Sequence, residues 1–142
     1  LEFFGVDQRH ESDIEGLGRI PAEQQLKSDK VPSFNVIGNS PLVLRESLLD
    51  EVYTMGENFV EAAKRVVSPG MNGPFCIEGV YDENAKFRSF EFSARIVAGS
   101  NIYMDGSPYY SLLFNEPMSM GKRIAREIKT ATESNQLDKI TT

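Results

Sequence analysis

Two alternating segments joined by a short polar stretch constrain the fold of this chain more than any other feature. Residues 75–81 and 87–96 place apolar side chains at about every second position, and the five residues between them are mostly polar. A period of two is typical of a half-buried β-strand, and so short a separator joins antiparallel neighbours. The pattern therefore predicts a β-hairpin with one apolar face and one polar face.

The pairing register of this hairpin determines what its polar face carries. A loop of residues 83–86 produces these pairs: Asp82 with Phe87, Gly79 with Phe90, Ile77 with Phe92 and Phe75 with Ala94. A loop one residue longer shifts the register by one and mixes the two faces, which the burial of one face opposes. The favoured register predicts that Glu78 lies directly opposite Glu91.

Two opposed carboxylates repel each other unless a third group relieves the repulsion. A proton on one of them, an arginine between them or a bridging divalent cation would each do so. Ser93 and Arg95 follow Glu91 on the same predicted face and add a hydroxyl and a guanidinium suited to phosphate. A solvent-exposed acidic pair without a ligand is the alternative at this point.

The remaining pattern predicts an α+β fold in which helices pack on an antiparallel sheet. Apolar residues from Leu48 to Val66 recur every three or four positions, which is typical of one amphipathic helix, and Pro117 opens another. Elsewhere we expect strands at 3–6 and 34–39, a turn at 38–41 and an irregular segment at 103–114. Between the first strand and about residue 31 we expect a polar loop, because the Gly and Pro residues of 16–21 oppose a regular helix.

Composition narrows the partners and the compartment. The 142 residues carry a net charge of −6 and 40% of them are hydrophobic, which suits a globular domain without general affinity for nucleic acid or anionic lipid. No apolar run approaches the roughly 18–20 residues of a membrane span. One cysteine and one histidine exclude a disulfide framework and a Cys/His zinc site, so we expect a cytoplasmic protein. The apolar start at Leu1, without Met, predicts a piece of a longer polypeptide.

The polar face of the hairpin resembles the metal-binding signature of ATP-grasp ligases. That signature is an acidic residue on one strand followed on the next by Glu-x-Asn-x-Arg, and the matching residues here are Glu78 and Glu91-Phe92-Ser93-Ala94-Arg95. Ser93 stands where the pattern has Asn. Longer segments are similar to the C-terminal part of the archaeal formate-dependent FAICAR synthetases, namely residues 36–39, 43–49, 90–101, 106–109 and 117–129.

This resemblance, which covers almost the whole chain, implies an ATP-dependent C–N ligase of purine (IMP) biosynthesis. Such an enzyme joins formate to the amine of aminoimidazole-carboxamide ribonucleotide (AICAR) through formyl phosphate, giving FAICAR, ADP and phosphate. The resemblance further implies Mg²⁺ or Mn²⁺ at Glu78 and Glu91, an AICAR contact at Asn39 and an ATP contact at Glu11. Residues 1–142 would form the C-terminal ATP-grasp lobe, with the lobe that clamps ATP upstream of them.

Arginines are further candidates, because phosphoryl transfer depends on positioning and on neutralising phosphate charge. We expect catalytic phosphate contacts at Arg95 and Arg45, then at Arg19, and a substrate contact at Asn101. The expected partners are ATP, formate and AICAR, together with further copies of the chain in a homo-oligomer. Two alternatives stay open: a relative of the same family that uses another carboxylate or amine, and a nucleotide- or metal-binding module without catalysis.

Overall fold

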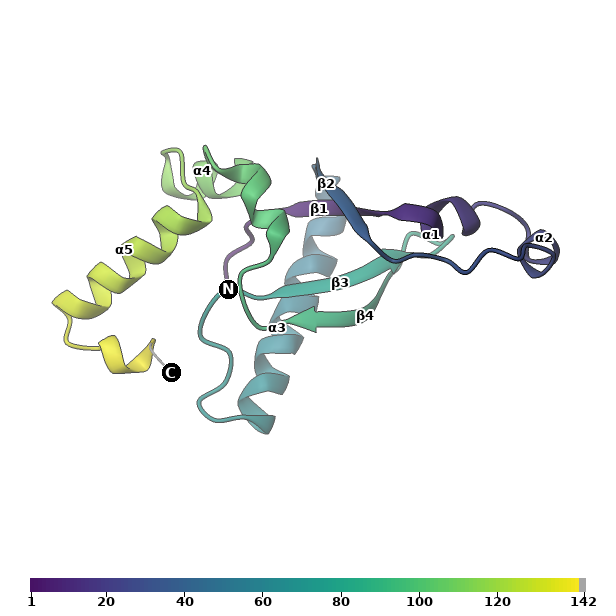
Figure 1. Cartoon of the computed structure of the whole chain (residues 1–142). Coiled ribbons are helices and arrows are strands. Elements are labelled where there is room, and N and C mark those ends of the chain that lie inside the picture. The colour runs from purple at the N-terminus through teal and green to yellow at the C-terminus, as the bar shows by residue number, and fades with distance from the viewer. Residues whose placement is uncertain (141–142) are drawn as a thin grey trace.

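Two separate two-stranded sheets form the β part of the chain. In the computed structural model, which describes residues 1–140, β1 (Val6–Glu11) pairs antiparallel with β2 (Val36–Leu42), and β3 (Cys76–Tyr81) pairs antiparallel with β4 (Phe87–Ser93) (Figure 1). The α+β class predicted from the sequence is confirmed. The antiparallel sheet expected there is divided into two.

Helices make up most of the remaining regular structure. They are α1 (Ser12–Leu17), α2 (Ala22–Leu26), α3 (Leu49–Val66), α4 (Pro108–Phe114) and α5 (Met120–Glu133), with short 3₁₀ segments at Glu46–Leu48, Ala98–Tyr103 and Leu137–Lys139. Serine hydroxyls cap two of these helices, because Ser107 before α4 and Ser119 before α5 each accept a backbone N–H of the first turn. Within residues 1–140 no helix combines the length and the apolar character needed to cross a membrane.

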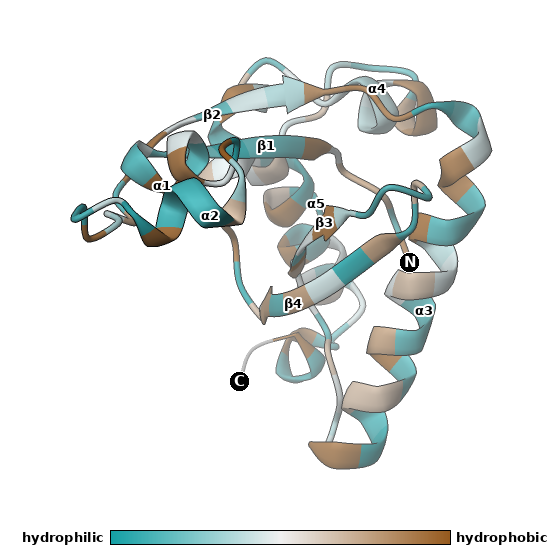
Figure 2. Cartoon of the chain, turned by 90° about the vertical axis from the view of Figure 1, so that its right-hand side faces the viewer, coloured by the Kyte–Doolittle hydropathy of each residue, from teal (hydrophilic) through white to brown (hydrophobic). Residues whose placement is uncertain are grey.

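The long helix α3 packs along the second hairpin, β3–β4 (Figures 1 and 2). The centroid of the Phe59 ring lies 4.7 Å from that of Phe75 and 5.0 Å from that of Phe92. Glu51 adds a polar link, because its Oε1 accepts the backbone N–H of Phe87 at 3.3 Å. In Figure 2 the ribbon of α3 alternates between brown and teal bands, as expected for a helix with one apolar stripe. The helix predicted from residue 48 to residue 66 is confirmed.

The most buried side chains gather where the N-terminal residues meet α4 and α5. In the part of the chain that the structure describes, the buried apolar residues are Tyr103, Tyr110, Met118 and Ala131. The Phe4 ring packs edge-on against Tyr103 and Tyr110, with centroids 5.6 and 4.9 Å away. The residues expected to form a strand at 3–6 therefore lie mainly in this core, and the strand begins only at Val6.

Short elements account for the predictions that are wrong. The stretch expected to be a loop before residue 31 contains β1, α1 and α2, and α1 includes Gly16. The residues expected to turn at 38–41 belong to β2, and the segment expected to be irregular at 103–114 contains α4. The strand β4 ends at Ser93 rather than at Ile96. Helices of five to seven residues make at most two turns, so they show no apolar repeat that could predict them.

Much apolar surface on the two sheets is uncovered. Phe90 and Phe92 of β4 are 66% and 60% exposed, and Ile37 of β2 is 71% exposed. Single exposed apolar side chains are ordinary, but several large ones on the strands of two small sheets are typical of a surface that another part of a protein covers.

Candidate active site

Glu78 of β3 is paired with Glu91 of β4 across the second hairpin, as the sequence predicts. The pair of Ile77 with Phe92 is also confirmed. Nearer the turn the register changes, and the observed pairs are Gly79 with Ser89, Val80 with Arg88 and Tyr81 with Phe87. Phe90 is therefore an extra residue, a β-bulge on β4, and the predicted pairs of Gly79 with Phe90 and of Asp82 with Phe87 are wrong. Phe75 and Ala94 lie just outside the paired strands.

The side chain of Asp82 stabilises the longer turn that the prediction rejected. Its Oδ1 accepts the backbone N–H groups of Asn84 and Lys86, at 3.0 and 2.9 Å, and its backbone N–H donates to the carbonyl of Lys86. Ala85 takes a positive φ of 56° in the same turn. The five-residue turn and the Glu78–Glu91 pair coexist because the bulge at Phe90 corrects the register between them.

Arg9 of β1 supplies the positive charge that relieves the acidic pair. Its Nη1 lies 2.9 Å from Oε2 of Glu78, and its Nε and Nη2 each lie 2.9 Å from Oε1 of Glu11. Burial acts to lower the pKa of Arg9, but the hydrogen bond to Glu11 and the charges of Glu78, Glu11 and Glu91 outweigh it, so this pKa is raised. One guanidinium thus joins the residue expected to contact ATP with one expected to bind metal.

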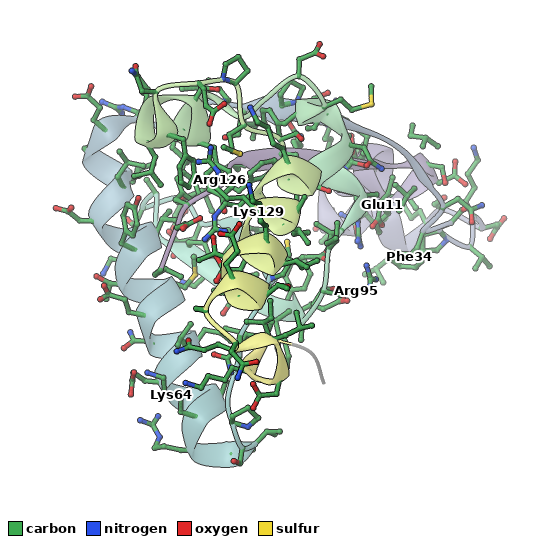
Figure 3. The ribbon with its side chains drawn as sticks, turned by 90° about the vertical axis from the view of Figure 1, so that its left-hand side faces the viewer. Glu11, Phe34, Lys64, Arg95, Arg126 and Lys129 are labelled. Atoms are coloured by element: carbon green, nitrogen blue, oxygen red, sulfur yellow. The ribbon has the colours of Figure 1, made fainter. Side chains whose placement is uncertain are left out.

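Arg95, which the sequence places on the strand beside Glu91, lies beyond the end of β4 instead. Its Nη1 donates to the backbone carbonyl of Ile96 at 2.8 Å, and within residues 1–140 no ion pair joins it to either glutamate. Figure 3 shows Arg95 on the same side of the molecule as Glu11, away from Lys64 of α3. The arginine that meets the acidic pair is therefore Arg9.

The thiol of Cys76 lies close to the charged side chains of the site. Burial is the main cause that raises the pKa of its thiol to about 11, and the charges of Glu78 and Asp7 act in the same direction. Arg9 and Arg95 act to lower that pKa, so both guanidinium groups lie within electrostatic reach of the thiol. At neutral pH such a thiol holds almost no thiolate, as expected of a packing residue rather than a nucleophile.

Asn39 of β2 is oriented by Asp7 of β1. Its Nδ2 donates to Oδ2 of Asp7, and Asn39 pairs with Arg9 in the strand ladder. Gly99 lies directly against the carboxylate of Asp7, because a Cβ at Gly99 would be only 2.3 Å from Oδ1 of Asp7. The amide expected to contact AICAR is therefore held in one orientation, next to the strand position of Arg9.

Three other predicted residues make no hydrogen bond or ion pair with Arg9, Glu78 or Asn39 in the described part of the chain. Arg45 is exposed immediately before the 3₁₀ segment Glu46–Leu48, and Asn101 is exposed within the segment Ala98–Tyr103. Arg19 has a side chain that is 78% exposed and lies 3.7 Å from Glu15. Their expected roles stay predictions.

The two opposed carboxylates fit a cation that shares its coordination with a nucleotide. Residues 1–140 contain no group of three or more His, Cys, Asp or Glu side chains that could hold a metal ion by themselves. Mg²⁺ is commonly bound through one or two carboxylates, with waters and phosphate oxygens as its other ligands, whereas a structural zinc site needs four protein ligands. Glu78 and Glu91 therefore suit Mg²⁺ or Mn²⁺ carried with ATP.

Sequence reasoning missed Asp7 and Arg9. Their signal is the alternation Asp7-x-Arg9-x-Glu11, which places three charged side chains on one face of a strand. The expectation of a loop over these residues concealed that signal.

Known proteins resemble the chain over its whole length. A family model described as "Domain of unknown function (DUF1297)" matches residues 1–142. A protein of Nitrosopumilus maritimus is 90% identical over 142 residues, and one of Methanococcus maripaludis is 50% identical over 140 residues. Both are named 5-formaminoimidazole-4-carboxamide-1-(beta)-D-ribofuranosyl 5'-monophosphate synthetase. The matches cover 100% and 99% of this chain but only 42% and 39% of those proteins.

A solved structure shares the fold. The IMP biosynthesis protein PurP from Thermococcus kodakaraensis is 35% identical with a TM-score of 0.79, and the match covers 99% of this chain and 44% of that one. The chain therefore spans less than half the length of these relatives. Because the family model matches every residue, the chain belongs to the DUF1297 family.

Proposed function

We propose that this chain is the C-terminal part of an ATP-grasp ligase that joins formate to AICAR in purine (IMP) biosynthesis. The products are FAICAR, ADP and phosphate. The names of the relatives support this proposal, because they describe synthetases of that formylated nucleotide. A cytoplasmic location and a homo-oligomeric state stay predictions.

The observation that carries the proposal is the opposition of Glu78 and Glu91, with Glu11 joined to Glu78 through Arg9. We assign Mg²⁺ or Mn²⁺ to Glu78 and Glu91, ATP to Glu11 and AICAR to Asn39. These residues come from both sheets, so the site would lie between them. The side chains of Glu11 and Glu78 are 17% and 20% exposed, which leaves both carboxylates accessible to a ligand.

The chemistry that such a site supports proceeds in two displacements. A formate oxygen attacks the γ-phosphorus of ATP, the bond from that phosphorus to the β-bridging oxygen breaks, and ADP leaves. The AICAR amine then attacks the carbonyl carbon of formyl phosphate, loses a proton, and expels inorganic phosphate. Each displacement concentrates negative charge on phosphate oxygens, so it is favoured by a bound cation and by arginines close by. The chain offers Arg95 and Arg45 for this role, and Asn101 for contact with substrate.

The part of the relatives that this chain does not span would supply the rest of the site. We assign the adenine and most phosphate contacts to that part, as the C-terminal lobe of an ATP-grasp enzyme holds only one side of its nucleotide. The uncovered apolar side chains of β2 and β4 support this assignment.

The test of the proposal is ADP release by the full-length protein, measured with AICAR and with formate present or absent. We expect ADP release to need both substrates and to fall by about 100-fold or more in Glu78→Gln and in Glu91→Gln, because each removes a cation ligand. Glu83→Gln, in the exposed turn of the same hairpin, is the matched control and should retain wild-type activity.

ADP release without formate or AICAR would contradict the proposal, as would full activity in Glu91→Gln. Release that requires a different small carboxylate or a different amine would favour a relative of the family with another substrate. Mass spectrometry of the nucleotide product distinguishes these results.

A further inference from the structure

We propose that Arg9 is a built-in counter-ion, which holds the acidic site together before a cation arrives and connects the ATP contact to the metal contact. This inference rests on the proposed function, since it takes Glu11 as the ATP contact and Glu78 and Glu91 as the metal ligands. We call Glu11, Glu78 and Glu91 the acidic cluster.

The guanidinium of Arg9 is shared between two elements that are not otherwise paired. Its Nε and Nη2 hold Glu11 at the end of β1, and its Nη1 holds Glu78 in the middle of β3, all at 2.9 Å. β1 and β3 belong to different sheets. A planar group with five donors can hold two carboxylates in this way, whereas a lysine ammonium lacks the fork geometry.

The charges explain why such a group is needed. Three carboxylates lie within electrostatic reach of Arg9, so one positive charge balances only part of their negative charge. Without Arg9 the carboxylates would repel one another and the two sheets would be pushed apart. With Arg9 alone the acidic cluster keeps two negative charges in excess, which is the charge that a divalent cation brings.

The two candidate metal ligands differ in what already binds them. Arg9 contacts Oε2 of Glu78, while the exposed carboxylate of Glu91 makes no side-chain hydrogen bond or ion pair in the described part of the chain. A carboxylate has two oxygens and several lone pairs, so Glu78 can bind Arg9 and a cation together. The positive charge of Arg9 repels a free cation and so weakens its binding to the acidic cluster. A cation that arrives with ATP is repelled less, because the negative charge of ATP offsets the charge of Arg9.

Two consequences follow for the wild-type protein. Arg9 lowers the affinity for the free metal ion, so the site favours the metal–nucleotide complex over the metal alone. Arg9 also keeps Glu11 in the position from which it contacts ATP, so its loss should weaken binding of ATP even where the metal binds better. Loss of a residue with only a structural role would not strengthen binding of the free metal ion while it weakens binding of ATP.

The experiment measures Mn²⁺ binding to the full-length protein without nucleotide, by isothermal titration calorimetry, in wild type, Arg9→Gln, Arg9→Lys and Arg88→Gln. We expect Arg9→Gln to bind free Mn²⁺ about tenfold more tightly, because a nearby positive charge is removed. Arg9→Lys keeps the charge and should bind Mn²⁺ as wild type does. Arg88, which pairs with Asp82 near the turn of the same hairpin, is the control and should leave Mn²⁺ affinity unchanged.

Steady-state kinetics supply the second measurement. In both Arg9 variants we expect KM for ATP to rise about tenfold, since neither can hold Glu11 and Glu78 through a fork, and kcat to change less. Arg9→Lys keeps the test valid if Arg9→Gln does not fold. Thermal unfolding with and without Mn²⁺ adds a check, because Mn²⁺ should raise the Tm of Arg9→Gln more than that of wild type.

Unchanged or weaker Mn²⁺ binding in Arg9→Gln would overturn the inference. If Glu91→Gln abolishes Mn²⁺ binding while Arg9→Gln binds like wild type, the metal assignment holds and only the role of Arg9 fails. If Glu91→Gln binds Mn²⁺ like wild type, the metal assignment of the proposed function fails, and the role of Arg9 fails with it.

Discussion

Gly99 packs so closely against the candidate site that even one added carbon, a Cβ, would collide with Asp7. Its missing Cβ would lie 2.3 Å from one oxygen of Asp7 and 2.5 Å from its carboxyl carbon, much closer than any real contact. Asp7 in turn accepts the hydrogen bond that orients the Asn39 amide. The absence of a side chain at residue 99 therefore sets the position of an amide on a different element.

We expect Gly99→Ala to raise KM for AICAR by about tenfold with a smaller effect on KM for ATP. The added methyl displaces the Asp7 carboxylate, and Asn39 then loses a charge-assisted hydrogen bond. Gly38→Ala, next to Asn39, is the matched control, because a Cβ there would meet nothing within 4 Å. Equal KM values for AICAR in the two variants would contradict the role of Asp7.

The site residues that could be predicted are those whose pattern lies within one short stretch of sequence. Glu78 and Glu91 come from one hairpin, so strand alternation places both on its polar face, and the bulge at Phe90 keeps them opposite each other although the turn is longer than predicted. Asp7 and Arg9 act on partners in other elements, and no local pattern states which strand lies beside β1. Arg95 was misplaced because β4 ends two residues before it, and strand ends are the least certain part of any such prediction.

At the scale of elements, the bulge at Phe90 requires a glycine on the opposite strand. A Cβ at Gly79 would lie 2.4 Å from the backbone carbonyl of Arg88 and 2.6 Å from the Phe87 ring. The backbone of β4 therefore approaches β3 too closely for any side chain at residue 79.

Gly79→Ala should lower the free energy of unfolding by about 2 kcal/mol, because the strands must separate or the ring must move. Thermal unfolding of the full-length protein measures the change. Gly16→Ala, whose Cβ would meet nothing within 4 Å, should leave the Tm unchanged or slightly raise it, since alanine favours a helix over glycine. A Gly79→Ala protein as stable as wild type would show that the bulge can relax without cost.

Long elements and short ones differ in how well the sequence predicts them. The apolar stripe of α3 repeats over 18 residues, and the second hairpin alternates over two strands, so both were predicted. The helix α4 has seven residues and no stripe, yet its start carries a serine cap followed by Pro108 at the first helical position. That pair of residues is a start signal which could have revealed the helix.

At the scale of the whole molecule, the distribution of apolar surface is typical of a chain whose strands are covered by another part of a protein. The buried core lies around Tyr103, Tyr110 and Met118. The strands that carry the candidate site hold Phe90, Phe92 and Ile37, which are 60–71% exposed. The curated relatives are more than twice as long as the aligned region.

We expect the isolated 142-residue chain to have no formate–AICAR ligase activity, because the proposed function assigns the surface that closes over ATP to the part of the relatives that this chain does not span. The isolated chain should also bind a hydrophobic dye such as ANS more strongly than the full-length protein does, since its apolar strands stay uncovered. ADP release with both substrates present measures the first expectation, and dye fluorescence measures the second. Turnover by the isolated chain would contradict this division of the site.

The two small sheets meet without a shared backbone ladder in residues 1–140, and the ion pair between Arg9 and Glu78 spans the gap. Such a junction behaves as a seam: the sheets can part along it by breaking side-chain contacts while every strand keeps its own hydrogen bonds. The proposed ligase would have to admit a nucleotide, a cation and two further substrates, and would then have to release three products. A seam through the centre of the site offers that passage at little cost to the fold.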